Sequence, residues 1–115
     1  MSGGHRIARV AGQVLGALSQ VLREGVRDPR VTPITLTRVE LSADLRHAKV
    51  YFALLGGQGD EKEIAEGLKA ASGYMSRELG RRIRMKFTPK LRFCIDRSAD
   101  DLARISTLLD GMKPS

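Results

Sequence analysis

The spacing of apolar residues changes repeatedly along this 115-residue chain, and these changes limit the folds open to it. From Arg6 to about Gly25, apolar residues recur every three or four positions, which predicts an amphipathic helix. From Ile34 to Ser42, and again from His47 to Leu55, apolar and polar residues alternate, which predicts two strands. Only residues 43–46 separate the two strands, so we expect an antiparallel hairpin.

The first of these strands contains a slip in its alternation. Ile34 and Leu36 fall on one face of a regular strand, whereas Val39 falls on the other. Because all three are apolar, we expect them to share the buried face. A β-bulge of one residue near residues 37–38 would restore that register.

A second helical pattern follows the hairpin, with Asp60 as its expected N-cap. Its apolar residues change face at Ala71-Ser72-Gly73, where glycine interrupts the pattern. We therefore expect either two helices joined there almost without a linker, or one helix sharply kinked there. A β-branched residue can be barred from such a kink, so Gly73→Val is expected to cost more stability than the mid-helix change Gly67→Ala.

After the break at Phe87-Thr88-Pro89, residues 90–95 alternate again and predict a third strand, with a short terminal helix beginning at Ser98. The expected order is helix-strand-strand-helix-helix-strand, an α+β fold with a three-stranded sheet and helices packed on one of its faces. We expect a single folded domain over residues 6–97. A disordered N-terminus (residues 1–5) would precede it, and a short helix with a flexible tail (residues 98–115) would follow.

Composition argues against several classes of protein. The single cysteine, Cys94, leaves no intramolecular disulfide, and the absence of a secretory signal fits the cytoplasm. No apolar run approaches the length of a membrane span. His5 and His47 lack partners with metal-ligand spacing, so no metal or other cofactor is expected. No catalytic motif is present, and we predict that the chain is not an enzyme.

Positive charge is concentrated in one segment. Residues 77–97 contain eight basic and two acidic side chains, and therefore carry six of the chain's seven net positive charges. The sequence pI is about 10.2. Such a concentration indicates a polyanionic partner, although a charge run can also be no more than a solvated face. Only three Phe and two Tyr are present, so phosphate contacts should outweigh base stacking.

The candidate RNA contacts follow from this segment. Arg77, Arg81 and Arg84 are spaced by four and three residues, which would place them on one helical face. The basic residues beside Asp28-Pro29 could also reach phosphates. The complete predicted set is Arg77, Arg81, Arg82, Arg84, Lys86, Lys90, Arg92, Arg27 and Arg30.

The expected order of elements is similar to the type II KH fold, an RNA-binding architecture. KH modules join their central helices by a Gly-x-x-Gly loop, and this chain instead has an Ala-x-Gly kink motif, Ala71-Ser72-Gly73. With that substitution the chain resembles the bacterial ribosome-binding factor A family. The matching segments include Arg6-Ile7-Ala8-Arg9-Val10, Glu24-Gly25-Val26-Arg27-Asp28-Pro29-Arg30-Val31, Thr35-Leu36-Thr37-Arg38-Val39-Glu40-Leu41-Ser42, Asp44-Leu45-Arg46-His47-Ala48-Lys49-Val50-Tyr51 and Thr88-Pro89-Lys90-Leu91-Arg92-Phe93.

The resemblance covers about residues 6–109 and implies a function. Members bind the immature small (30S) ribosomal subunit and its 16S rRNA, promote late maturation and processing, leave before translation, and matter for growth in the cold. It implies a cytoplasmic protein without catalytic activity; we expect a monomer, with other assembly factors as further partners. One departure is Pro89-Lys90-Leu91, where the family usually has Pro-Glu-Leu. The alternative from the residues alone is a protein-binding module that its charge merely keeps soluble.

Overall fold

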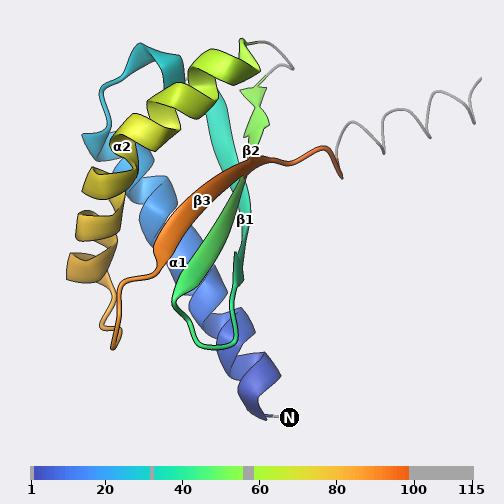
Figure 1. The fold of residues 1–115 in the computed structure, drawn as a ribbon, viewed down its shortest axis with the longest axis vertical. Coiled ribbons are helices and arrows are strands. Elements are labelled where there is room, and N and C mark those ends of the chain that lie inside the picture. The colour runs from blue at the N-terminus through green and yellow to red at the C-terminus, as the bar shows by residue number, and fades with distance from the viewer. Residues whose placement is uncertain (1, 32, 56–58, 99–115) are drawn as a thin grey trace, which may run out of the picture.

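The computed structural model describes residues 2–31, 33–55 and 59–98. Two long helices and a three-stranded sheet account for most of this part of the chain (Figure 1). The elements are α1 (Ser2–Gly25), the short 3-10 helix η1 (Pro29–Val31), β1 (Ile34–Leu41), β2 (His47–Leu54), α2 (Glu61–Arg82) and β3 (Lys90–Ile95).

The sheet is mixed, with β2 between β1 and β3. β1 and β2 pair antiparallel, which confirms the predicted hairpin. β3 pairs parallel to β2, because the chain returns through α2 before entering β3. The sheet order and the parallel pairing were not among the sequence predictions.

The predicted bulge is confirmed in β1. Leu36 pairs with Phe52 and Arg38 with Tyr51, so Thr37 is the extra residue between two otherwise regular stretches of the ladder. The bulge returns Val39 to the buried face that Leu36 shares. It also leaves Thr37 and Arg38 exposed, both on strand β1.

One face of the sheet forms the core with both helices. Alternate residues of β1 and β2 are buried against α1 and α2, whereas the opposite face is left uncovered by the described residues. The buried apolar residues are Val14, Leu18, Val21, Val31, Ile34, Leu36, Val39, Ala48, Val50, Phe52, Ile64, Leu68, Met75 and Leu79. The arrangement is the expected α+β packing, with helices on one side of the sheet.

Two expectations about the helices need correction or restriction, and a third is confirmed. α1 begins at Ser2, so residues 2–5, which we expected to be frayed, are helical; extending an existing helix adds one hydrogen bond per residue without a new nucleation cost. Asp60 is the N-cap of α2 as predicted, accepting from the backbone N–H groups of Lys62 and Glu63. The predicted terminal helix and tail lie outside the described residues, except for Ser98.

The prediction of two central helices is wrong, because α2 runs without interruption from Glu61 to Arg82. The described order is therefore helix-strand-strand-helix-strand. Gly73 lowers helix stability by about 1 kcal/mol relative to Ala. Burial of Met75 and Leu79 beyond it, both fully buried, outweighs that cost. The alternative prediction, a single helix kinked at Ala71-Ser72-Gly73, is not decided by this continuity.

The surroundings of Gly67 and Gly73 differ in a way that the sequence did not show. A Cβ added at Gly67 would lie 2.9 Å from Val31 Cγ1 and 3.1 Å from Arg30 Cβ, so α2 meets η1 closely at this point. A Cβ added at Gly73 would meet only Arg77 Nη1, at 3.5 Å. Of these two glycines, Gly67 is therefore the one that packing requires.

No helix in the described ranges is long and apolar enough to cross a membrane.

Candidate nucleic-acid interface

The predicted basic residues do not form one patch along one helix. They fall on α2, on the linker formed by residues 83–89, on β3, and near η1. Arg77, Arg81 and Arg82 lie on α2, Arg84 and Lys86 on the linker, Lys90 and Arg92 on β3, and Arg27 and Arg30 beside or within η1.

The prediction that Arg84 shares a helical face with Arg77 and Arg81 is wrong. α2 ends at Arg82, and Ile83 has extended backbone angles (φ −126°, ψ 127°) while its N–H donates to the Leu79 carbonyl. Arg84 therefore lies on the linker, where no helical spacing applies. The four- and three-residue spacing in the sequence extends past the end of the helix.

Two arginines at the end of α2 are engaged by acidic and polar side chains. Arg81 forms an ion pair with Glu78 at 3.3 Å. Arg82 lies 3.9 Å from both Glu78 and Glu24, and it donates to Gln20 Oε1 at 3.2 Å. Arg82 thus fastens the end of α2 to α1, and part of its charge is neutralised before any partner arrives.

The linker lines a groove of about 470 Å³ together with α1 and the connection between β1 and β2. Four cationic residues surround this groove, and the lining contains one carboxylate, Asp44. The cations are Arg6, Arg46, Arg84 and Lys86. None of the four has an ion pair among the residues that the structure describes.

The groove also has an apolar side. Phe87 is 43% exposed, one of the few large apolar residues at the surface of the described chain. The Arg46 guanidinium lies over its ring, with Cζ 4.3 Å from the ring centroid, and Lys86 Nζ is 5.6 Å away. Other apolar lining residues are Val10, Leu45, Ile83 and Met85.

A second basic area lies where β2 and β3 run side by side. His47 pairs with Lys90, and Lys49 pairs with Arg92. These four residues line a shallower hollow of about 440 Å³. In the described ranges, Lys49, Lys90 and Arg92 form no ion pair. Lys90 and Arg92 therefore lie beside two further residues from β2, His47 and Lys49, which were not among the predicted RNA contacts.

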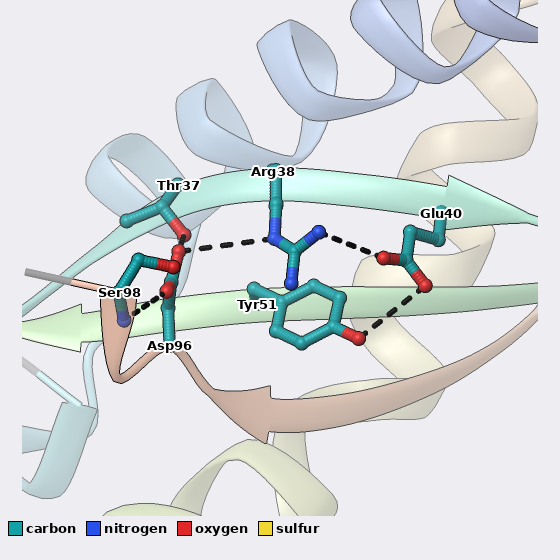
Figure 2. Close-up of polar contacts among 6 residues, drawn as sticks. All are labelled: Thr37, Arg38, Glu40, Tyr51, Asp96 and Ser98. Atoms are coloured by element: carbon teal, nitrogen blue, oxygen red, sulfur yellow. Dashed lines mark hydrogen bonds and ion pairs between the residues drawn. The ribbon is translucent and has the colours of Figure 1, made fainter. Parts of the chain in front are cut away.

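Elsewhere on the open face of the sheet, positive charge is neutralised. Figure 2 shows Arg38 lying across Tyr51, between Glu40 and Asp96. Arg38 Cζ is 3.8 Å from the Tyr51 ring centroid, and its Nη1 is 2.8 Å from Glu40 Oε1. The Tyr51 hydroxyl donates to the other Glu40 oxygen at 3.3 Å. Tyr51 is half-buried and its hydroxyl is held by Glu40, so its ring is less accessible to a base than that of the exposed Phe87.

Asp96 joins the end of β3 to the bulge of β1 (Figure 2). Thr37 Oγ1 donates to its carboxylate at 2.6 Å, and the Ser98 backbone N–H donates at 2.9 Å. Arg38 Nε lies 3.9 Å away. Hydrogen bonds from Ser98 and Thr37, with a smaller contribution from the Arg38 charge, lower the pKa of the Asp96 carboxyl to about 2.

The basic residues near η1 have different surroundings. Arg30 donates hydrogen bonds to the Asp28 carboxylate from Nε, at 3.0 Å, and from Nη2, at 2.6 Å. These hydrogen bonds lower the pKa of the Asp28 carboxyl. The charge of Arg30 is thus paired with Asp28 of the same loop, whereas Arg27 has no ion pair within the described ranges.

The residues of the kink motif lie within α2. Ser72 Oγ donates to the Lys69 carbonyl at 2.8 Å, one turn back along the helix. Gly73 is exposed, so its backbone faces solvent. The motif is not part of the linker groove.

Sequence reasoning missed three contributors to the groove, Arg6, Arg46 and Phe87. Arg6 and Arg46 lie far along the chain from the basic segment, and only the fold brings them to the linker. Phe87 had a usable signal, an aromatic ring beside Lys86 inside the basic segment, but its neighbours Thr88 and Pro89 suggested only a break in structure. The described residues hold no group of three or more His, Cys, Asp or Glu suited to a metal ion.

Comparison with known proteins places this geometry in a family. The sequence model of the ribosome-binding factor A family matches residues 6–109. A ribosome-binding factor A from Azoarcus sp. (strain BH72) is 48% identical over 105 residues, which cover 91% of this chain and 83% of that protein.

Solved structures agree with the sequence match. The crystal structure of ribosome-binding factor A from Thermus thermophilus has a TM-score of 0.73 at 28% identity, covering 80% of this chain and 98% of that one. A homology model of the Thermus thermophilus factor, fitted into the cryo-EM map of a 30S–RbfA complex, has a TM-score of 0.67 at 28% identity, covering 80% and 97%. Because the family match extends over most of the sequence, the chain belongs to the ribosome-binding factor A family.

Proposed function

We propose that this protein binds the small (30S) ribosomal subunit in the cytoplasm through phosphates of its 16S rRNA. It would act while the subunit is immature, promote late maturation and processing of the RNA, and leave before translation. The requirement for it would be greatest in the cold, where misfolded RNA escapes slowly. The observation that carries the proposal is the family match over residues 6–109.

The family is one of ribosome-binding factors, so the protein acts by binding and is not an enzyme. The complex of the Thermus thermophilus factor with 30S supports the small subunit as the partner. The charge distribution fits this role, since the linker and the β2–β3 area present cations without ion pairs among the described residues. Such cations can exchange counterions for phosphates without first breaking an internal pair.

We assign the RNA contacts in two ranks. The first rank is formed by residues whose charge is uncompensated within the described ranges: Arg77, Arg84, Lys86, Lys90, Arg92 and Arg27. Arg81, Arg82 and Arg30 form the second rank, because acidic neighbours already hold them. Binding by the first-rank residues would break no ion pair within the described ranges.

The KH-like interpretation of the fold belongs to the same proposal. The helix-strand-strand-helix-strand order fits it, and the two halves of the α2 ribbon run in different directions in Figure 1. We place the change of direction at Ala71-Ser72-Gly73, in the position of the Gly-x-x-Gly loop of KH modules. Exposure of Gly73 would allow its backbone to approach RNA closely.

The proposal is tested by sedimentation with purified subunits. The protein should sediment with small subunits and not with large subunits at moderate salt, and crosslinks should map to the first-rank residues and to 16S rRNA. Cells lacking the protein should accumulate immature 16S rRNA, more at low temperature. Equal sedimentation with both subunits would reduce the binding to nonspecific electrostatics. Binding that does not weaken with salt would favour a protein-binding module instead.

A further inference from the structure

We propose that the linker groove holds one unstacked RNA nucleotide, with its base against Phe87 and its phosphates among the surrounding cations. This inference rests on the proposed function and names the form of RNA that the groove accepts. It differs from phosphate contact alone, because it assigns a base-binding role to a particular aromatic residue.

The exposure of Phe87 is the first argument. A phenylalanine that is 43% exposed at the edge of an apolar surface loses the benefit that burial would give it. The Arg46 guanidinium stacks on its ring, with Cζ 4.3 Å from the centroid. The pair presents an aromatic plane and a guanidinium plane together, and single-stranded bases stack on both kinds of surface.

The size of the groove is the second argument. Its volume of about 470 Å³ lies within the range of roughly 300–1,000 Å³ typical of pockets for small ligands. That space suits a single nucleotide and is too small for a duplex. A base that has left its stack could therefore enter, while the neighbouring backbone stays outside.

The charge of the groove is the third argument. Arg6, Arg46, Arg84 and Lys86 face one carboxylate, that of Asp44. Asp44 accepts hydrogen bonds from Ser42 Oγ, at 2.6 Å, and from the Arg46 backbone N–H, at 3.0 Å. Its role is thus to shape the connection that positions Arg46. The remaining positive charge fits a phosphate on either side of the base. A peptide of acidic residues would satisfy the cations but would offer no aromatic ring to the Phe87–Arg46 stack.

The test compares two probes with equal charge. One is a fluorescent dodecamer of uridine, and the other is a dodecamer of abasic ribose phosphates. The intact protein should bind the uridine dodecamer more tightly. Phe87→Ala should lower affinity for uridine by about 5-fold to 100-fold, as expected when one stacked base is lost, and should leave the affinity for the abasic probe unchanged. Because Phe87 is at the surface, the thermal midpoint should change little.

Two matched variants sharpen the result. Phe87→Leu keeps an apolar side chain without the ring, and should lose most of the preference for uridine. Tyr51→Leu removes the aromatic ring on the open sheet face, and should keep the preference. Equal binding of both probes by the intact protein would overturn the inference, as would a preference that survives Phe87→Ala. Phe87-dependent binding of a fluorescent polyglutamate, without a uridine preference, would overturn it in favour of a peptide groove.

These outcomes are separate from those that test the proposed function. If the intact protein sediments selectively with small subunits but shows no base preference, only the groove assignment fails. If selective sedimentation is absent, the proposed function fails whatever the two probes show.

Discussion

Helix α2 and the linker that follows it share one run of positive charge, but they use it differently. On α2, Arg81 and Arg82 are held by Glu78 and Glu24, and the opposite side of the helix is buried in the core. On the linker, Arg84 and Lys86 line an open groove and form no ion pair within the described ranges. Density of charge in a sequence is therefore a poor guide to the charge that a partner meets. Apart from Arg77, we expect changes in α2 to affect mainly folding, and changes in the linker to affect mainly binding.

The largest effect is expected on α2, from Gly67→Ala. The new Cβ would lie 2.9 Å from Val31 Cγ1 and 3.1 Å from Arg30 Cβ, so α2 and η1 would have to separate. Overpacking of this kind costs about 1–3 kcal/mol of unfolding free energy. Urea denaturation would measure the loss.

Gly73→Ala is the matched control on the same helix. Only the end of the Arg77 side chain lies near the added Cβ, at 3.5 Å. The change should therefore stabilise the protein by up to about 1 kcal/mol, as Gly→Ala does in an open helix. Equal destabilisation by the two variants would show that Gly73 has a backbone constraint of its own.

A smaller effect is expected at Asp96, which neutralises Arg38 as Glu78 neutralises Arg81. Asp96→Asn weakens hydrogen bonds to a charged acceptor and should lower stability by about 1–2 kcal/mol. The folded-state pKa of Asp96, about 2, lies below its ordinary value of 3.8. Its stabilising contribution is therefore complete above about pH 4 and is lost as the pH falls toward 2.

Thermal midpoints recorded between about pH 5 and pH 2 would check this contribution. The midpoint of the intact protein should fall more steeply than that of Asp96→Asn in this window, because the variant has no carboxyl to protonate at this position. Parallel curves would indicate that the contacts of Asp96 with Thr37 and Ser98 do not lower its pKa, and therefore add no pH-dependent stability.

The smallest effect is expected from Glu78→Gln on α2, which tests whether the ion pairs of this helix withhold its arginines from RNA. Glu78→Gln should release Arg81 from its ion pair and leave Arg82 with Glu24 as its acidic partner, and so raise affinity for small-subunit RNA by about twofold to threefold. Filter binding with purified subunits would measure the change. Reduced affinity would mean that Glu78 positions these arginines for RNA rather than withholding them.

Features that depend on neighbouring residues could be predicted from the sequence, whereas features that depend on contacts between distant segments could not. The slip in alternation between Leu36 and Val39 was enough to predict the bulge. The bulge is set by which side chains of the strand itself are apolar, and the sequence shows these directly. The continuity of α2 across Gly73 was missed, since it depends on core burial of Met75 and Leu79 that local propensity does not contain.

The candidate site follows the same rule. The basic segment identified Arg84 and Lys86 directly, but a spacing argument placed Arg84 on a helix that ends before it. The partners that decide which cations stay available come from elsewhere in the chain. Glu24 reaches Arg82 from α1, and Arg46 reaches Phe87 from the β1–β2 connection.

The salt dependence of small-subunit binding tests the central claim most directly. Two double variants remove equal charge: Arg84→Ala with Lys86→Ala on the linker, and Arg81→Ala with Arg82→Ala on α2. Each lost phosphate contact reduces the slope of log affinity against log salt by about 0.7 for a single strand and by about 0.9 for a B-form duplex. The linker variant should therefore have a slope shallower by about 1.4 to 1.8, while the α2 variant keeps a slope close to that of the intact protein. Equal flattening in both variants, or flattening in the α2 variant alone, would contradict the account.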